Sequence, residues 1–272
     1  FTGWKMIALL LSACTTGLDD PVVLVGLYNT STYSGHPAET ASYVSPSVFA
    51  YTLSVESGEI TSFGSRNSAP AGLNVSWITR HPHLAGVMYA VSEVAEFNGS
   101  QTGSVATVMF DPDLASPTFT VKGRVATHGT GPVFATVDAT GSWLLVANYA
   151  GGQLVVLPIG RDGLLSAEAA DIQFQGAGTH SVYLDPTLHE FVLSPVLGLD
   201  KVDLWRLNAT NGKLTPNRSP SLSFPAGFGP RHLAFSPIDP GIVLLAEEGG
   251  AATPSRVTLC TFDSASSMLA AV

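Results

Sequence analysis

Charged residues are scarce in this chain. Only 12% of the 272 residues are charged, roughly half the usual share in soluble proteins. The 12 Lys and Arg residues form no run and are outnumbered by 21 Asp and Glu, which gives a net charge of −9 at neutral pH. This balance argues against nucleic acid as a partner, because a phosphate-binding surface needs clustered basic side chains. Apolar runs are also short, so no segment approaches the ~20 residues of a membrane-spanning helix.

Cysteine is nearly absent, with Cys14 and Cys260 as the two examples. This count excludes a Cys-rich metal site, and we expect neither a metal nor another cofactor. Cys14 closes an apolar stretch that follows Lys5 and resembles the end of a secretory leader. Because the sequence starts at Phe1 rather than Met, we expect the true N-terminus to lie elsewhere. We predict a leader-like hydrophobic segment over residues 1–20, with a stray hydrophobic tail as the alternative.

Asparagine is uncommon too, but most of its positions share one pattern. Five of the eight Asn residues stand in Asn-x-Ser/Thr sequences: Asn29, Asn74, Asn98, Asn208 and Asn217. With 28 Ser and 24 Thr in the chain, chance would supply about one and a half such sites. The excess favours a secreted glycoprotein, with coincidence in a Ser/Thr-rich chain as the alternative. Because Pro220 weakens the last site, we expect N-glycans at Asn29, Asn74, Asn98 and Asn208, and a secreted or extracellular location, with a cytoplasmic one as the alternative.

The abundant residues are those of short strands and turns, with 27 Gly and 18 Pro beside the many Ser and Thr. Four segments align with one another, and each has a strand, a turn and a second strand: 77–93, 133–149, 181–197 and 232–248. The aligned turn positions are Pro82, Ala139, Pro186 and Pro237. The second strands are expected at 87–91, 143–147, 191–195 and 242–246.

This repeat predicts the fold. Strands of about six residues in units of ~40–50 residues are typical of β-propeller blades, each an antiparallel sheet of four strands. No segment has a sustained helical period. A first unit begins with a strand at 22–28, and residues 249–272 suffice for one more strand at 256–262. We therefore predict an all-β propeller of about five blades over residues 21–272.

Four motifs occur in order along these units. They are NYAGG at 148–152, HSV at 180–182, LGLDKV at 197–202 and GFGPRHL at 227–233. Together they resemble the signature of the seven-bladed β-propeller lactonase family, which includes 6-phosphogluconolactonases and relatives of carboxymuconate-lactonizing enzymes. The resemblance spans residues 22–262 and implies a propeller that hydrolyses a lactone. It also implies a ring of seven blades, so we expect the C-terminal blades to be missing from this chain. The chain departs from the family pattern at Phe134, Val196 and Ala246.

Equivalent positions in successive blades lie on one ring around the propeller axis. Counting from the turns, and guided by the resemblance, we expect these side chains to converge at one mouth of the central channel: Glu93, Asn148, His180, Arg231, His232 and Glu247. Lactone hydrolysis needs a base for water, a donor to the carbonyl oxygen and a clamp for the substrate. We expect catalytic roles for Glu247, His180 and His232, and substrate binding by Arg231, Asn148, Glu93 and Lys201.

Each of these roles has a structural alternative. Arg231 could pair with Glu247 or Glu248, His180 could be hydrogen-bonded at a blade turn, Asn148 could cap a turn, and Glu93 could lie at a blade junction. The acidity of the chain also repels anions at long range. An anionic substrate would therefore need a local basic cluster, for which the candidates are Arg231, Lys201, His180 and His232.

Three functions remain open at this point. The leading one is a hydrolase of the 6-phosphogluconolactonase type, in which water attacks a small sugar or acidic lactone that we expect to be anionic. The second is a lactonizing isomerase of the carboxymuconate type. The third is a non-catalytic propeller that binds a ligand, which the departures at Phe134, Val196 and Ala246 favour.

Overall fold

The computed structural model describes residues 6–12, 22–28, 38–40, 42, 45–62, 68–111 and 118–272. Apart from one short 3-10 turn, η1 (Leu197–Leu199), the regular structure of these residues is entirely β-strand. The strands form five antiparallel sheets and one short parallel pair, β3 (Ala38–Glu39) with β9 (Glu96–Phe97). The prediction of an all-β fold is therefore confirmed.

The five sheets, numbered here 1 to 5, follow one another along the chain. Sheet 1 contains β1 (Met6–Ser12), β2 (Val22–Leu27), β4 (Val48–Leu53), β5 (Ile60–Ser62) and β6 (Ser68–Ala69). Sheet 2 contains β7 (Val75–Arg80), β8 (Val87–Ser92), β10 (Ser104–Asp111) and β11 (Thr118–Ala126). Sheet 3 contains β12 (Pro132–Val137), β13 (Trp143–Asn148), β14 (Gln153–Pro158) and β15 (Asp171–Phe174).

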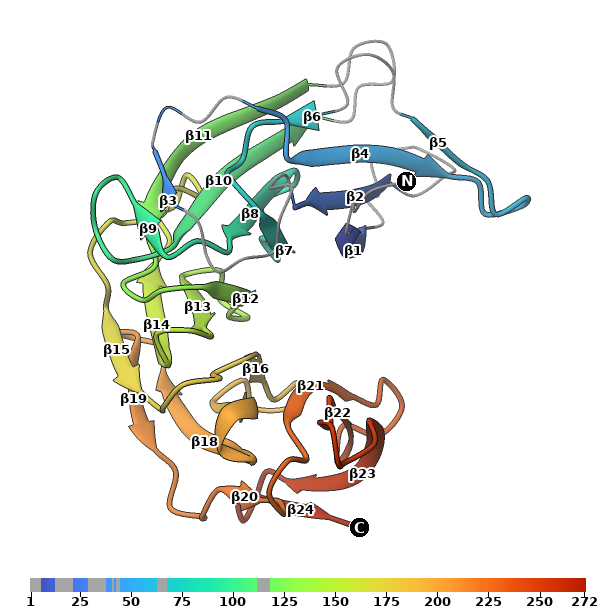
Figure 1. The fold of residues 1–272 in the computed structure, drawn as a ribbon, viewed down its shortest axis with the longest axis vertical. Helices are drawn as coiled ribbons and strands as arrows, with labels where there is room; N and C mark the ends of the chain where they lie inside the picture. The colour runs from blue at the N-terminus through green and yellow to red at the C-terminus, as the bar shows by residue number, and fades with distance from the viewer. Residues whose placement is uncertain are drawn as a thin grey trace.

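Sheets 4 and 5 repeat this pattern. Sheet 4 contains β16 (Tyr183–Leu184), β17 (Phe191–Val196), β18 (Lys201–Asn208), β19 (Lys213–Pro216) and β20 (Leu222–Ser223). Sheet 5 contains β21 (Pro230–Phe235), β22 (Ile242–Glu247), β23 (Arg256–Asp263) and β24 (Met268–Ala271). Figure 1 shows the sheets side by side in an arc, with β7, β12, β16 and β21 on its inner side and β11, β15 and β19 on its outer side.

The structure differs from the sequence prediction after Glu248 and contains a further strand near the start of the chain. After Glu248 the chain forms two strands rather than one, because a turn after Asp263 lets β24 return along β23 and complete sheet 5. Near the start, Met6–Ser12 is the strand β1, which pairs antiparallel with β2. The leader expected over residues 1–20 stays a prediction, and Cys14 lies outside the described residues.

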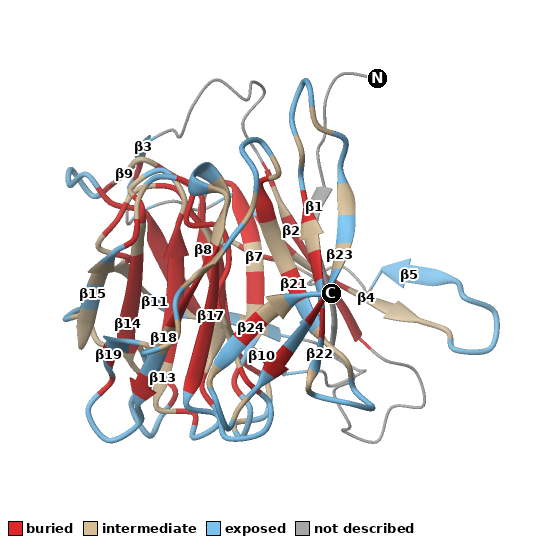
Figure 2. Cartoon of the chain, turned by 90° about the horizontal axis from the view of Figure 1, so that it is seen from below, coloured by how far each residue is buried: buried red, intermediate tan, exposed pale blue. Residues whose placement is uncertain are grey.

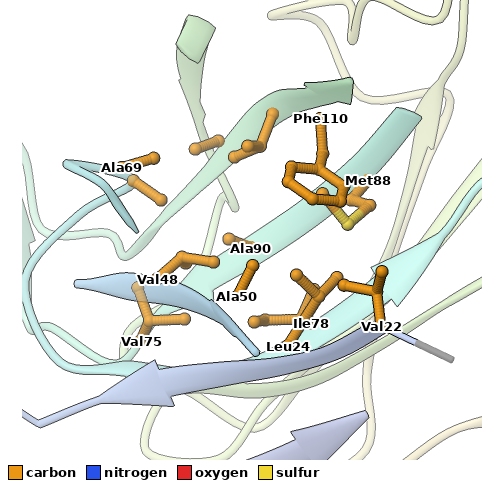
Figure 3. Close-up of a cluster of buried hydrophobic side chains, with 13 residues drawn as sticks. Val22, Leu24, Val48, Ala50, Ala69, Val75, Ile78, Met88, Ala90 and Phe110 are labelled. Carbon is orange, nitrogen blue, oxygen red and sulfur yellow. The ribbon is translucent and has the colours of Figure 1, made fainter. Parts of the chain in front are cut away.

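Apolar side chains fill the spaces between neighbouring sheets. All six residues of β8 and of β17 are buried, because each of these strands is covered on both faces. Figure 2 shows β8, β14 and β17 as buried, whereas β5 and β15 carry exposed residues. Figure 3 shows the cluster between sheets 1 and 2, where Leu24, Ile78, Met88 and Phe110 meet. Burial of this apolar surface is the main force that holds successive sheets together.

In sheets 2 to 5, a side chain fixes the turn that joins the first two strands. In sheet 4 the buried Asp185 carboxylate accepts hydrogen bonds of 2.7–3.1 Å from four backbone N–H groups of the turn that leads into β17. The same position holds His81 in sheet 2, Asp138 in sheet 3 and Ser236 in sheet 5, and each accepts backbone N–H groups of its own turn. This repeated turn holds the inner strand in a fixed register against the strand that follows it.

Candidate active site

A β-bulge near the start of each inner strand turns one side chain toward the centre of the arc. The register shifts by one residue between Val75 and Trp77, between Pro132 and Phe134, and between Pro230 and His232. The pairings Thr179↔Val196 and Tyr183↔Leu193 show the same shift in sheet 4. The corresponding residues of the four sheets are Ser76, Val133, His180 and Arg231. Bulges commonly re-aim side chains next to functional sites.

A second set of side chains comes from the residue that directly follows the second strand of a unit. In sheets 1, 2, 3 and 5 this residue is Tyr28, Glu93, Tyr149 and Glu248. In sheet 4 the corresponding residue is Leu197, which begins the turn η1. The second strands of the units have equal lengths, and the sheets are related by an approximate rotation. The residue that follows the second strand therefore lies at the same height in each sheet.

The two sets enclose a cavity of about 360 Å³. Its lining combines acidic, basic and aromatic side chains: Tyr28, Ser76, Trp77, Glu93, Val133, Tyr149, His180, Arg231, His232 and Glu248. The Trp77 ring stacks on Phe134 at a centroid distance of 4.1 Å and lies 5.9 Å from the His232 ring. An apolar wall with a few converging polar groups is the usual composition of a small-molecule site.

Two histidines stand side by side in this cavity. The rings of His180 and His232 are 4.8 Å apart and nearly perpendicular. Burial and the neighbouring Arg231 guanidinium lower the pKa of His180 to about 2 and that of His232 to about 4. Both imidazoles are therefore neutral at physiological pH. The Nδ1 atom of His180 is buried without a hydrogen-bond partner, whereas Nδ1 of His232 lies 3.1 Å from the Tyr183 hydroxyl.

Glu93 supplies a buried carboxyl group to the same cavity. The Tyr28 hydroxyl donates a hydrogen bond to Oε2 of Glu93 across 65 residues of sequence. Burial raises the pKa of Glu93, against the opposing effects of hydrogen bonds from Tyr28 and Ser76 and of the Arg231 charge. A carboxylate with a raised pKa is a stronger base than an exposed one.

Arg231 is held by contacts to both its backbone and its side chain. Its Nε lies 2.8 Å from Oε2 of Glu248, and both side chains are about half exposed. Its carbonyl oxygen accepts a 2.6 Å hydrogen bond from the Ser181 hydroxyl. The loop that precedes it is tied to Asp200, whose carboxylate accepts the N–H groups of Gly227 and Gly229. These contacts join sheets 4 and 5 at the cavity.

Four of the residues expected to converge do so. His180, Arg231, His232 and Glu93 all line the cavity. Arg231 also pairs with Glu248, which was the structural alternative for its role. The register argument thus located these four side chains correctly, while their chemical roles remain proposals.

Three other expected site residues lie elsewhere. Glu247 directly precedes Glu248, which lines the cavity, and consecutive side chains of an extended chain point to opposite sides. Its buried carboxylate therefore lies outside the cavity and pairs with Arg256 and Thr258 of β23.

Asn148 is fully buried and donates from Nδ2 to the carbonyl oxygen of Thr127. This contact is structural, but it ties β13 to the loop before β12 and does not cap the turn at Gly151, as the alternative expected.

Lys201 is the third correction. It begins β18 and forms an ion pair of 2.9 Å with Asp203 two residues later on the same strand. It does not line the cavity. The basic cluster expected around Arg231 therefore lacks its lysine, and both of its histidines are neutral.

Tyr28 and Glu248 were not predicted as site residues, and Asn148 was predicted in place of its neighbour Tyr149. The turns differ in length, since β13 begins four residues after Ala139 whereas the other second strands begin five after theirs. A count of ten from the turn therefore selects Tyr149 but also Glu247, one residue short of Glu248. Counting six residues from the start of each second strand would have selected all three.

No group of three or more His, Cys, Asp or Glu side chains in the described part of the chain is arranged to hold a metal ion. Among the same residues, no helix is long and apolar enough to cross a membrane.

The chain matches a family model and several curated proteins. The family model is "Lactonase, 7-bladed beta-propeller", which matches residues 28–270. The 6-phosphogluconolactonase of Pectobacterium carotovorum is 38% identical over 114 residues, which is 42% of this chain and 33% of the relative. That of Bacillus subtilis is 32% identical over 143 residues, which is 50% of this chain and 39% of the relative. The match thus spans about a third of the length of these relatives.

Solved structures show the same fold. A Bacteroides uniformis protein has a TM-score of 0.74 at 22% identity, over 94% of this chain and 67% of its own. The periplasmic gluconolactonase of Pseudomonas aeruginosa has a TM-score of 0.63 at 21% identity, over 93% of this chain and 82% of its own. The family model covers most of the chain and agrees with the repeated four-stranded sheets. The chain therefore belongs to the seven-bladed β-propeller lactonase family.

Proposed function

We propose that this chain is a lactone hydrolase whose reaction takes place in the cavity at the centre of the arc. The observation that carries the proposal is the meeting of a buried carboxyl group, two neutral imidazoles and a guanidinium within one small cavity. Membership of the family and the names of the matched relatives support the same reaction class. Hydrolysis adds water to the lactone carbonyl carbon and breaks the bond from that carbon to the ring oxygen.

Glu93 is the base in this proposal. Its carboxylate takes a proton from the attacking water and can return it to the ring oxygen as that oxygen leaves. The raised pKa of Glu93 suits this role, because it makes the carboxylate a stronger base than an exposed glutamate. His180 is a poor base, since its pKa of about 2 leaves little affinity for a proton. We assign it a hydrogen bond to the substrate instead.

His232 polarises the carbonyl group. A neutral imidazole has one donor and one acceptor nitrogen, and Nδ1 already lies 3.1 Å from the Tyr183 hydroxyl. Burial raises the pKa of Tyr183 to about 12, so this phenol keeps its proton and can donate it to Nδ1. Nε2 then carries the ring proton and serves as donor to the carbonyl oxygen, with Arg231 nearby to stabilise the charge that develops there.

Export and glycosylation form a separate part of the proposal. Asn98 is exposed in a turn and Asn208 is exposed at the end of β18, which leaves room for a glycan at each. Asn74 is only 2% exposed, so the glycan expected there has no access to its side chain and that expectation is corrected. Asn29 lies outside the described residues. Mass spectrometry of the protein from a secreting eukaryotic host, before and after glycosidase treatment, tests the two exposed sites.

A pair of isosteric variants tests the hydrolase assignment. We expect Glu93→Gln to lower kcat on D-glucono-1,5-lactone by about 100-fold or more, because a general base contributes about that factor. Glu247→Gln makes the same change in a buried carboxylate outside the cavity, and should leave kcat within about threefold of the unchanged protein. Acid release is followed by titration at constant pH and corrected for spontaneous hydrolysis.

Two results would contradict the assignment. A chain that never exceeds the spontaneous rate on any lactone would favour the non-catalytic propeller. A chain that instead converts carboxymuconate, detected by ultraviolet absorbance, would favour the lactonizing isomerase. Equal loss of activity in Glu93→Gln and Glu247→Gln would remove Glu93 from the role of base.

A further inference from the structure

The charges in the cavity balance one another. Among the described residues that line it, Arg231 is the one permanent cation, and Glu93 and Glu248 are the two carboxyl groups. Arg231 and Glu248 lie 2.8 Å apart from Nε to Oε2, so the positive charge already faces a negative partner. Whether Glu93 is protonated or ionised, the sum of these charges is zero or negative.

The histidines do not add positive charge. Both are shielded from water within the cavity, and Arg231 beside them further disfavours a second cation. His232 is in addition held by Tyr183 at Nδ1, a contact that a neutral ring satisfies. The cavity therefore presents imidazole groups that can form hydrogen bonds but that carry no charge near neutral pH.

Five other basic side chains of the described residues form ion pairs outside the cavity. The ion pairs are Arg124 with Glu39, Lys201 with Asp203, Arg206 with Glu190, Lys213 with Asp171, and Arg256 with Glu247. None of these cations lines the cavity. The lining of the cavity includes no described Lys or Arg other than Arg231. Among the described residues, it therefore lacks the local basic cluster that an anionic substrate requires in so acidic a chain.

We propose that the cavity of this chain selects an uncharged lactone, such as a free aldonolactone, over a phosphorylated or otherwise anionic one. This inference rests on the proposed function and replaces the expectation of an anionic substrate. A phosphomonoester carries a charge of about −1.5 to −2 at neutral pH and is normally bound by several Arg, Lys or backbone N–H donors. Here it would meet one guanidinium that is already paired and two carboxyl groups.

The same lining suits the hydroxyl groups of a free sugar. Carboxylates such as Glu93 and Glu248 accept hydrogen bonds from hydroxyl groups, and the imidazoles can both donate and accept. The flat faces of Trp77 and Tyr149 offer apolar surface to the C–H bonds of a sugar ring. Polyhydroxylated, uncharged rings are therefore better matched to these side chains than anions are.

The first experiment compares two substrates that differ only in charge. We expect kcat/KM for D-glucono-1,5-lactone to exceed that for its 6-phosphate by at least tenfold at pH 7 and low ionic strength. Raising the salt concentration should narrow this gap, because screening weakens the repulsion between the phosphate and the carboxylates. A preference for the phosphorylated lactone would overturn the inference while leaving the hydrolase assignment intact.

The second experiment changes the balance of charge within the cavity. Glu248→Gln releases Arg231 from its partner, and we expect the ratio of activity on the phosphorylated lactone to that on the free lactone to rise about tenfold. Glu190→Gln is the matched control, because it removes the same charge from a similarly exposed ion pair outside the cavity, that with Arg206. An equal rise in both variants would show that the net charge of the protein, rather than Glu248, sets the preference.

Calorimetric titration keeps the inference testable if no turnover is seen. The probes are D-glucono-1,5-lactam and its 6-phosphate, which resemble the two lactones but resist hydrolysis. Tighter binding of the neutral lactam would support the inference even if the chain proved inactive. Tighter binding of the phosphorylated lactam, or no binding of either, would overturn it.

Discussion

The two neutral histidines of the cavity should make the stability of the fold fall as the pH is lowered. In the folded protein His180 and His232 have pKa values of about 2 and about 4, below the ordinary value of 6.5. Below pH 6.5 the unfolded chain therefore binds protons that the folded chain does not. Protons then favour unfolding, so the stabilising contribution is complete above pH 6.5 and is lost progressively toward the folded pKa values.

The size of the effect follows from these pKa values. At pH 5 an unfolded histidine is almost fully protonated, whereas neither cavity histidine is substantially so. Linkage then gives a loss of about 2 kcal/mol for each histidine between pH 8 and pH 5. Together they would remove about 4 kcal/mol, a large part of the ~5–15 kcal/mol that stabilises an ordinary domain. Burial raises the pKa of Glu39 and Glu93, so these two groups act in the opposite direction.

A difference measurement isolates the histidine contribution from that of the glutamates. The free energy of unfolding is measured by urea titration with circular dichroism at pH 8, 6.5 and 5 for the unchanged protein and for His232→Gln. We expect the unchanged protein to lose about 2 kcal/mol more than the variant between pH 8 and pH 5. His189→Asn alters an exposed histidine in a turn outside the cavity, and should follow the unchanged protein at every pH.

One outcome would refute this reasoning. If the difference between the unchanged protein and His232→Gln stayed constant within about 0.5 kcal/mol over this range, burial would not be holding His232 neutral. The assignment of His232 as a neutral hydrogen-bond donor would then fail as well, because a protonated ring could not accept the Tyr183 hydroxyl at Nδ1.

Two further predictions concern the frame that carries the site. Asp185→Ala should lower the free energy of unfolding by about 3 kcal/mol or more in urea titration, because four backbone N–H groups lose their buried acceptor; a loss below about 1 kcal/mol would show that water replaces the carboxylate at little cost. Gly212→Ala should lower the melting temperature by several degrees in calorimetry, since a Cβ there would lie 2.6 Å from the Trp143 ring at a φ of +71°. Gly58→Ala, with a similar φ of +73° but nothing within 4 Å, is its control, and equal shifts would leave backbone strain as the whole cause.

The fold could be predicted from the sequence because its signals are local. Each unit carries an inner strand, a turn-fixing residue and a second strand within about 17 residues, and apolar content marks the buried strands. The second strands accordingly begin at the expected residues. What the sequence underestimated was the end of the chain, where exposed strands such as β24 have little apolar pattern to identify them.

The site was predictable in part for the same reason. The bulge positions stand six residues before each turn, and this spacing is constant, so His180 and Arg231 were located correctly. The spacing after the turn varies by one residue, and in a strand a shift of one residue reverses the direction of the side chain. Glu247 was therefore expected in place of Glu248. The contact between Tyr28 and Glu93 joins residues 65 positions apart, and no local pattern indicates it.

The recurrence of one bulge in every unit has a consequence for how such a site changes over time. Each bulge fixes where a side chain points through backbone pairing, and the identity of that side chain plays no part in the pairing. Ser76, Val133, His180 and Arg231 show that a hydroxyl, a methyl pair, an imidazole and a guanidinium all fit the same backbone geometry. A mutation at such a position can therefore alter chemistry at small cost to folding. New specificities can therefore arise by single replacements at the bulge positions. Libraries for laboratory evolution can be confined to these few codons.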